Sequence, residues 1–179
     1  MVDPSIRLAV PAEAEACADL WLAFQREHNR RYVRTVRLTR ANRAAMAAHF
    51  AKLQAVDQLW VVVDAGRAVG FAAVSPNLPK IDVAYSSAAL TDLWLDPPYR
   101  GRGLGRRLID RVVADVAARG LDAVTISVQA GNPARRLYRA AGFQPLSETL
   151  IMPVVAGAVR TGPGYVADGG AAGPHAERG

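Results

Sequence analysis

Apolar residues recur along the first part of the chain with the spacing of helices. A short apolar run at 6–10 predicts a strand, and after Pro11 helical spacing follows at Cys17, Leu20, Trp21, Phe24 and His28. Thr39 is placed to cap a second helix, whose apolar face comprises Met46, Ala47, Phe50 and Leu53. The chain is therefore expected to begin with one strand and two amphipathic helices.

The spacing then changes to that of strands. The apolar runs 59–63 and 68–74 are separated by Asp64, Ala65, Gly66 and Arg67, which is the chemistry of a hairpin turn. We expect two antiparallel strands here, followed by a loop at 75–79, where two prolines and an asparagine occur.

The second half repeats an order of strand, turn and helix. Residues 90–95 read as a strand that ends at two prolines, and a helical face follows at Leu104, Leu108, Ile109, Val112, Val113 and Val116, closed by Gly120. Val124, Ile126 and Val128 alternate with polar residues, which predicts a strand with one buried face. Asn132 then caps a helix that Gly142 ends, and residues 143–146 and 149–152 are expected to supply two final strands.

The length of 179 residues fits one domain, which we place at residues 1–155. Residues 156–179 are rich in glycine, alanine and proline, and we expect them to form a flexible tail. No apolar run approaches the roughly 18 to 20 residues of a membrane span, so no membrane association is expected. The N-terminal residues lack a secretory pattern, which predicts a cytoplasmic location.

Composition narrows the chemistry only slightly. The formal charge is +6 and twenty of the twenty-two basic residues are arginine, which favours an anionic partner without choosing among nucleic acid, phosphorylated cofactor and acidic substrate. Cys17 is the sole cysteine, so an internal disulfide is excluded and a buried structural thiol is expected. The three histidines lack ligand-like spacing, so no metal is predicted.

The segment 100–107 carries the clearest chemical signal. A strand, a glycine-rich turn and a helix in that order bring free backbone N–H groups and the positive end of the helix dipole to one place. Gly101, Gly103 and Gly105 permit close approach of the backbone to an anion, and Arg100, Arg102, Arg106 and Arg107 add positive charge. The spacing GxGxG differs from the dinucleotide-binding GxGxxG, and the P-loop lysine is absent. A diphosphate is the anion we expect, with an ordinary glycine-rich loop as the alternative.

Two separated motifs resemble those of the GNAT acetyltransferase family. Arg100, Gly103 and Gly105 match its Gln/Arg-x-x-Gly-x-Gly/Ala motif, and a second signature is matched by Asn132, Ala134, Tyr138, Gly142 and Phe143. The resemblance covers residues 90 to about 152. The N-terminal half matches the family only in the order of its predicted helices and strands. It implies an α/β fold with a mixed, mostly antiparallel sheet of six to seven strands and about four helices.

The resemblance also implies a co-substrate, acetyl-CoA, and a set of residues that bind it. Leu93, Trp94 and Leu95 would contact the pantetheine arm, and Asn132 would contact the cofactor near the start of its helix. The diphosphate would lie on the turn formed by Arg100, Gly101, Arg102, Gly103, Leu104, Gly105 and Arg106. The implied reaction is transfer of an acetyl group to a primary amine of an unidentified small molecule or peptide, by direct attack in a ternary complex.

Two residues are candidates for proton transfer. Tyr138 occupies the position of a family tyrosine that protonates the departing thiolate, although a tyrosine on an apolar helical face is also a common core residue. Asp92 is the carboxylate within the strand that precedes the turn, and it is either the base that takes the amine proton or a structural acid that binds an arginine. The oxyanion would be stabilised by a backbone N–H near Leu93.

Several alternatives stay open at this point. The same fold can serve a non-catalytic acyl-CoA sensor or docking module, although the presence of Tyr138 argues weakly against that alternative. A longer acyl group or an oxygen acceptor is not distinguished by sequence. Nothing resembles a recognition helix or an RNA-binding aromatic platform, so no nucleic-acid partner is expected. Many family members pair, which allows a homodimer. The arginine-rich segment 26–43 is either a solvated basic surface or part of a site for an anionic acceptor.

Overall fold

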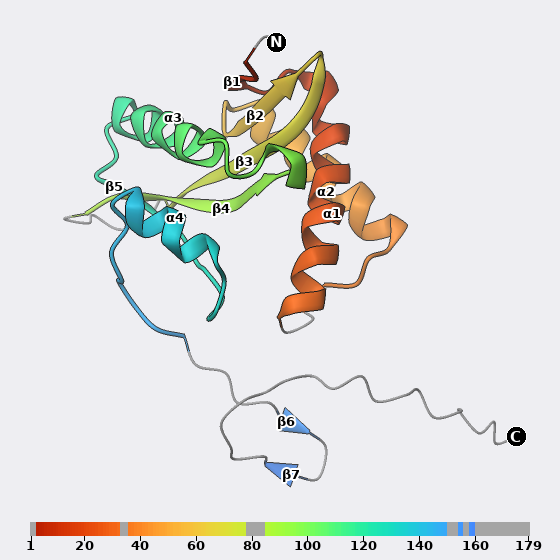
Figure 1. The fold of residues 1–179 in the computed structure, drawn as a ribbon, viewed down its shortest axis with the longest axis vertical. Helices are drawn as coiled ribbons and strands as arrows, with labels where there is room; N and C mark the ends of the chain where they lie inside the picture. Colours follow the sequence, from red (N-terminus) through yellow and green to blue (C-terminus); the bar gives the residue numbers. More distant parts are fainter. Residues whose placement is uncertain (1–2, 33–35, 78–84, 150–153, 156–157, 160–179) are drawn as a thin grey trace, which may run out of the picture.

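The structure is a computed structural model, and it describes residues 3–32, 36–77, 85–149, 154–155 and 158–159. Five strands form one sheet in the spatial order β1-β2-β3-β4-β5 (Figure 1). Their bounds are β1 Ser5–Leu8, β2 Leu59–Asp64, β3 Arg67–Asn77, β4 Ser87–Leu95 and β5 Ala123–Thr125. Neighbouring strands are antiparallel except β4 and β5, which are parallel. The predicted mixed α/β fold is confirmed, with five strands in the sheet of the described residues instead of six or seven.

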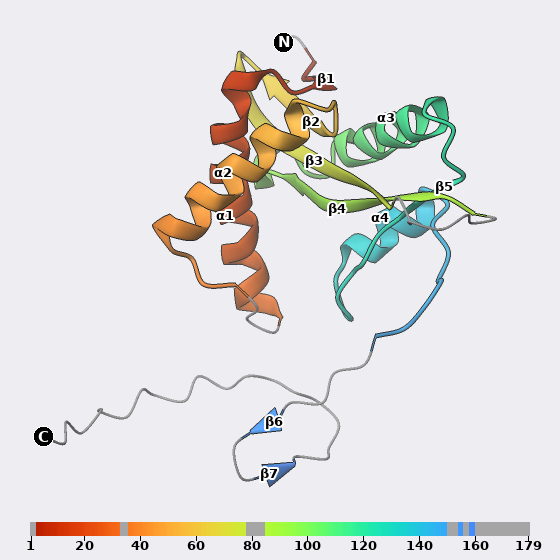
Figure 2. The same cartoon turned by 180° about the vertical axis from the view of Figure 1, so that it is seen from behind.

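Helices lie on both faces of this sheet (Figures 1 and 2). Helices α1 (Ala14–Arg31) and α2 (Arg40–Gln54) cover one face, and α3 (Leu104–Ala118) and α4 (Ala134–Ala140) pack on the other side. Short 3-10 turns, η1 (Pro11–Glu13) and η2 (Pro97–Tyr99), precede α1 and follow β4. Strands β6 (Val154–Val155) and β7 (Ala158–Val159) pair only with each other. Among the described helices, none combines the length and apolar character needed to cross a bilayer.

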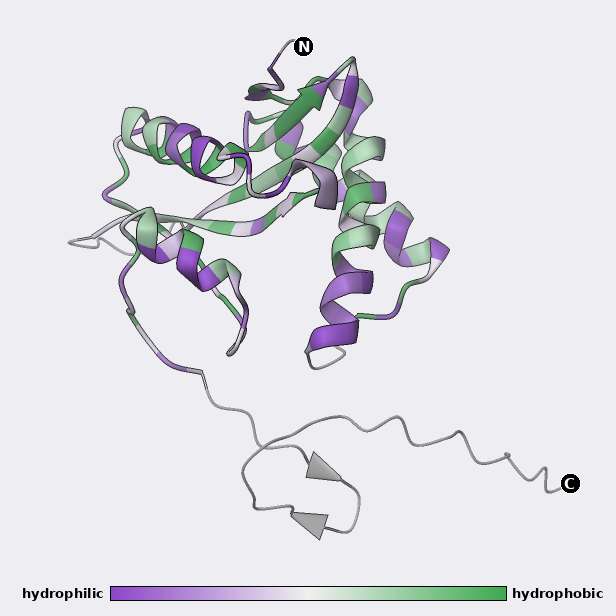
Figure 3. Ribbon diagram, in the orientation of Figure 1, coloured by the Kyte–Doolittle hydropathy of each residue, from purple (hydrophilic) through white to green (hydrophobic). Residues whose placement is uncertain are grey.

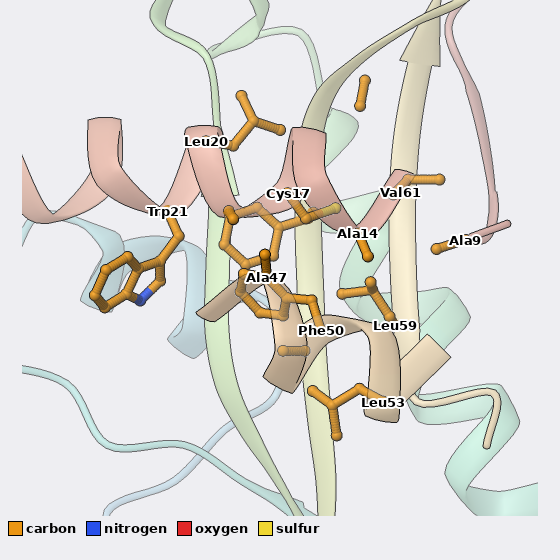
Figure 4. Close-up of a cluster of buried hydrophobic side chains, with 14 of the residues drawn as sticks. Ala9, Ala14, Cys17, Leu20, Trp21, Ala47, Phe50, Leu53, Leu59 and Val61 are labelled. Atoms are coloured by element: carbon orange, nitrogen blue, oxygen red, sulfur yellow. The ribbon is translucent and has the colours of Figure 1, made fainter. Parts of the chain in front are cut away.

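The first core lies between the sheet and the pair α1–α2. Cys17 and Trp21 of α1 and Phe50 of α2 are buried there, as the helical spacing predicts (Figure 4). Phe50 packs edge-to-face on Phe71 of β3, with ring centroids 5.2 Å apart. Thr39 caps α2 as expected, because its hydroxyl accepts a hydrogen bond of 3.1 Å from the backbone N–H of Asn42. Burial raises the pKa of the Cys17 thiol to about 12.

The second core lies between the sheet and α3–α4. Its largest fully buried side chains include Leu90 of β4 and Leu108 and Val112 of α3. The prediction that Val113 lies on the buried face of α3 is wrong, since Val113 is 43% exposed. The buried stripe of α3 centres on Val112, and the small Gly105 lies within it, so Val113 falls at its edge.

Strand β3 is longer than the sequence predicts, because residues 75–77 continue it where we expected a loop. Pro76 is tolerated for a geometric reason. The N–H of Val74 points toward β2, where it donates to the carbonyl of Gln58 at 2.9 Å, and the nitrogen of Pro76 points the same way two residues later. At Pro76, β3 has no partner strand on that side, because β2 begins only at Leu59, opposite Ala73. The missing N–H of proline therefore costs no hydrogen bond between strands.

Strand β4 contains a bulge that sets the direction of its later side chains. The register runs from Val74↔Leu90 to Ala73↔Asp92, so Thr91 is the extra residue. Leu90 faces α3, whereas Asp92 and Trp94 face α1 and α2. Asp92 therefore lies on the same face as Trp94 and opposite Leu93, as the alternation predicts.

Strand β5 is shorter than predicted, because it pairs with β4 only from Ala123 to Thr125. Val124, Ile126 and Val128 all pack against the second core, so the expected burial is correct although the strand ends early. Beyond Ala89, no described strand pairs with β4 on its β5 side. The predicted strand at 143–146 is also wrong, since these residues form no regular structure, and 150–152 lie outside the described residues.

Candidate functional site

The glycine-rich turn joins the end of β4 and η2 to the start of α3. Gly101 and Gly103 have positive φ values of 72° and 76°, and Gly103 is the N-cap of α3. A Cβ added at either position would meet no atom within 4 Å. The backbone conformation, and not crowding within the protein, therefore requires glycine, and the space above the turn is open to a ligand.

The first turn of α3 is available to an anion. No side chain caps this helix, so the N–H groups that follow Gly103 receive no side-chain acceptor at the N-cap. These groups and the positive end of the helix dipole favour a negatively charged oxygen at this point. A turn of this geometry can bind an anion.

The arginines of the turn make contacts within the protein. The guanidinium of Arg102 lies 5.5 Å from the ring centroid of Tyr99. Arg106 donates to Asp110 at 2.8 Å and to the carbonyl of Ala140 at 2.7 Å, and so joins α3 to the last residue of α4. Arg100 pairs with Glu27 of α1, so the turn touches both layers of helices.

Three predicted segments of the site meet where α3 begins. A Cβ on Gly105 would lie 3.1 Å from Leu137 of α4 and 3.6 Å from Leu95 of β4. Asn132 shapes the approach to α4, since its side-chain oxygen accepts a hydrogen bond of 2.9 Å from the backbone N–H of Ala134. The N-cap of α4 is Pro133, one residue later than predicted, so Asn132 makes this hydrogen bond from just before the cap. The end of β4, the turn and α4 lie together.

Tyr138 lies on the inner face of α4 in the second core. Tyr138 is 8% exposed, and its ring packs edge-to-face on the ring of Phe143, with the two centroids 5.9 Å apart. Burial raises the pKa of Tyr138 to about 12. The phenol is therefore protonated at neutral pH and can act only as a proton or hydrogen-bond donor toward an anion.

Asp92 is half-buried on the opposite face of the sheet. Burial raises the pKa of this carboxyl above its ordinary value, and the Thr91 hydroxyl, the charge of His49 and the Trp21 indole partly offset the rise. Among the described residues, the groups that shift the pKa of Asp92 do not include an arginine. A carboxylate whose pKa is raised by burial is a stronger base than one in water.

The structure thus separates the two candidates for proton transfer. Tyr138 approaches β4 from the side of α3 and α4, and Asp92 projects from β4 toward α1 and α2. Leu93, between Asp92 and Trp94, faces the same side as Tyr138. Tyr138 and Asp92 therefore lie on opposite faces of the sheet.

Three residues near the site were not predicted from sequence. His49 of α2 neighbours Asp92, Glu27 of α1 reaches Arg100 from 73 residues away, and Thr91 is the extra residue of the bulge in β4. The bulge at Thr91 has no signature in the sequence. Within the described part of the chain, no three His, Cys, Asp or Glu side chains gather as metal ligands would.

The model of the Acetyltransferase (GNAT) family matches residues 15–143. The chain belongs to this family. A curated relative, the mycothiol acetyltransferase of Beutenbergia cavernae, is 39% identical over 90 residues, which cover 50% of this chain and 29% of that protein. The match to this GNAT chain therefore spans less than a third of the length of that relative.

Solved structures share the fold of this GNAT chain at low sequence identity. A transcriptional regulator from Bacillus halodurans C-125 has a TM-score of 0.65 at 20% identity, over 84% of this chain and 99% of its own. An aminoglycoside N-acetyltransferase in complex with CoA has a TM-score of 0.65 at 18% identity, over 84% of this chain and 94% of its own. At these identities the comparison establishes the GNAT fold alone.

Proposed function

We propose that this chain is an N-acetyltransferase that transfers the acetyl group of acetyl-CoA to a primary amine by direct attack in a ternary complex. Its family membership supports the reaction type. The observation that carries the proposal is the uncapped start of α3 at the open, left-handed Gly103, directly after a strand whose neighbour has ended. This arrangement offers adjoining places for a diphosphate and an extended arm.

The cofactor would lie along β4 and across the turn. Beyond Ala89 no described strand pairs with β4 on its β5 side, so backbone groups of Leu93, Trp94 or Leu95 are available to the amides of pantetheine. The diphosphate would accept hydrogen bonds from the N–H groups of the turn between residues 100 and 106. Asn132, at the start of α4, would lie along the same path.

The proposed chemistry uses the two faces of β4. The amine nitrogen attacks the thioester carbonyl carbon, and Asp92 takes the proton that nitrogen must lose. A backbone N–H near Leu93 would stabilise the oxyanion. The carbon–sulfur bond then breaks, and the departing thiolate accepts a proton from Tyr138. A thiolate expelled into a partly dry site is more basic than in water, which aids transfer from a phenol of raised pKa.

The acceptor would approach from the side of α1 and α2, since Asp92 projects there. The C-terminal end of α1 is strongly hydrophilic (Figure 3). Several arginines of this region are already paired, because Arg43 binds Asp19 and Glu15 and Arg31 binds Glu27. Small polar amines are the first compounds to screen, because the similar proteins named above include a mycothiol and an aminoglycoside acetyltransferase.

Calorimetric titration with acetyl-CoA and CoA tests the cofactor site. We expect micromolar binding that Gly103→Leu abolishes, because a side chain at φ of 76° strains the turn and fills the space above it. Gly66→Leu is the matched control, since Gly66 has a φ of 77° and equally open surroundings in the β2–β3 turn. Absence of binding to any CoA species by the native protein would refute the proposal. Binding without acetylation of any amine would favour the sensor alternative.

Tyr138→Phe tests whether Tyr138 donates a proton to the departing thiolate. Removal of the hydroxyl should lower turnover by roughly 10²-fold, in the range of general acid catalysis, and leave the Kd of acetyl-CoA nearly unchanged. The ring stays buried against Phe143, so stability should change little. An unchanged turnover number would assign Tyr138 to the core alone.

A further inference from the structure

Arg100 opens the motif that the family resemblance assigns to the cofactor, yet its side chain is already occupied. Its Nε donates to the carbonyl of Leu95 at 2.9 Å. Its two terminal nitrogens donate to the two carboxylate oxygens of Glu27, each at 3.1 Å. This is the paired, fork-to-fork geometry that makes arginine–carboxylate contacts specific.

The flat face of the guanidinium is occupied as well. It lies 4.2 Å from the centroid of the Trp94 ring, and Phe24 of α1 lies 5.6 Å from the same ring. The Trp94 indole N–H is buried and has no hydrogen-bond partner in the described residues. Contacts with Arg100 and Phe24 therefore hold the ring in place.

Arg100 thus joins two elements, β4 and α1, at the first residue of the turn. It contacts the last residue of β4, the face of Trp94 and the side chain of Glu27 on α1. Three of its five N–H groups are used within the protein, and the Glu27 carboxylate adds a negative charge beside it. This is a poor arrangement for a phosphate ligand and a good one for a structural clamp.

We propose that Glu27 is a positioning residue, which acts with Arg100 to clamp the start of the cofactor turn onto α1. In this role Arg100 supports the turn and Trp94, and does not itself bind the diphosphate. The inference rests on the proposed function, because it concerns how the turn binds CoA. It also links the cofactor turn to the helix that lies beside Asp92.

The change in CoA affinity caused by Glu27→Gln distinguishes the clamp from direct binding of phosphate by Arg100, because the two roles predict changes of opposite sign. If Arg100 were a phosphate ligand, loss of the Glu27 charge would free it, and CoA would bind more tightly. If Glu27 holds the turn, CoA should bind more weakly. We expect an increase in the Kd of CoA of roughly three- to tenfold, the scale of one well-formed ion pair.

The experiment is calorimetric titration of the full chain with CoA, for the native protein, Glu27→Gln, Arg100→Gln and the double variant. Both single changes should weaken binding by a similar factor, and the double variant should bind no more weakly than either. Arg100→Lys should not restore affinity, because lysine keeps the charge but not the fork. Glu15→Gln, on the same helix, is the control and should leave the Kd unchanged. Tighter binding by Glu27→Gln, or full rescue by lysine, would overturn the clamp.

A second measurement needs no cofactor. Urea unfolding of the same four proteins gives a double-mutant cycle, and the clamp requires a favourable coupling between Glu27 and Arg100. A coupling of zero would overturn the inference even if CoA binds. A native protein that fails to bind CoA would refute the proposed function, while the unfolding cycle would still decide whether the clamp exists.

Discussion

At the scale of single residues, Asp92 shows how a bulge gives a side chain its chemistry. Without the extra residue Thr91, Asp92 would face α3 together with Leu90. The bulge turns it toward Trp21 and His49, where burial raises the pKa of its carboxyl. A charged carboxylate at this buried position lowers the stability of the fold. A role in proton transfer would explain why the chain nevertheless has an aspartate here.

Asp92→Asn should therefore stabilise the protein at neutral pH and lower its turnover. The raised pKa means that the folded state holds its proton more tightly, so the contribution of Asp92 to stability declines as the pH rises through the folded-state pKa. The asparagine side chain does not ionise, so the variant should not lose stability in this pH range. Turnover with the best amine from the screen should fall by roughly 10²-fold or more.

Urea unfolding at several pH values and steady-state kinetics provide the two measurements. A structural acid bound to a cation would behave in the opposite way, because its replacement would destabilise the protein. Loss of stability together with unchanged turnover would therefore remove Asp92 from the mechanism.

At the scale of elements, strands β3 and β4 approach closely at Gly70. A Cβ there would lie 2.8 Å from the backbone oxygen of Trp94 and would also collide with the side chain of Leu95. Because one of these atoms is backbone, the contact cannot be relieved by a rotamer change alone. Gly70 thus fixes the position of the strand end that leads into the cofactor turn.

Gly70→Ala should destabilise the fold by roughly 1 to 3 kcal/mol, as overpacking of a core does. It should also weaken CoA binding, since Leu95 lies beside Gly105 at the start of α3. Urea unfolding and calorimetry measure the two effects. Gly66→Ala has no colliding neighbour and should leave the Kd of CoA unaltered. Native-like stability in Gly70→Ala would show that the strands can separate at little cost.

Sequence periodicity proved a better guide to burial than to hydrogen bonding. The sequence pattern correctly predicts that Val124, Ile126 and Val128 face the second core, against which they are partly buried, but their strand ends at Thr125, where its pairing with β4 stops. Pro76 indicates a loop when residues 75–79 are considered alone, because a single segment does not show that β3 lacks a partner strand on one side there. Alternation records which side chains avoid water, whereas strand length depends on the neighbouring chain.

At the scale of the whole molecule, the sequence predicted the fold class and the helices, because each depends on local pattern, whereas the anion-binding role of the glycine-rich turn stays a prediction. It could not predict that Asp92 and Tyr138 lie on opposite faces, since that relation depends on the bulge and on the sheet order. The partner of Arg100 was equally hidden, because Glu27 lies 73 residues away on another helix. Long-range pairings of side chains have no periodic signature.

The burial of Cys17 has a practical consequence for studying the reaction. It is the sole cysteine of the sequence, it is fully buried, and its pKa is about 12. At neutral pH only roughly one such thiol in 10⁵ is ionised, and the thiolate is the reactive form. A chromogenic thiol reagent should therefore not label the folded protein. The free thiol released with each turnover would then be counted directly, in real time, whichever amine receives the acetyl group.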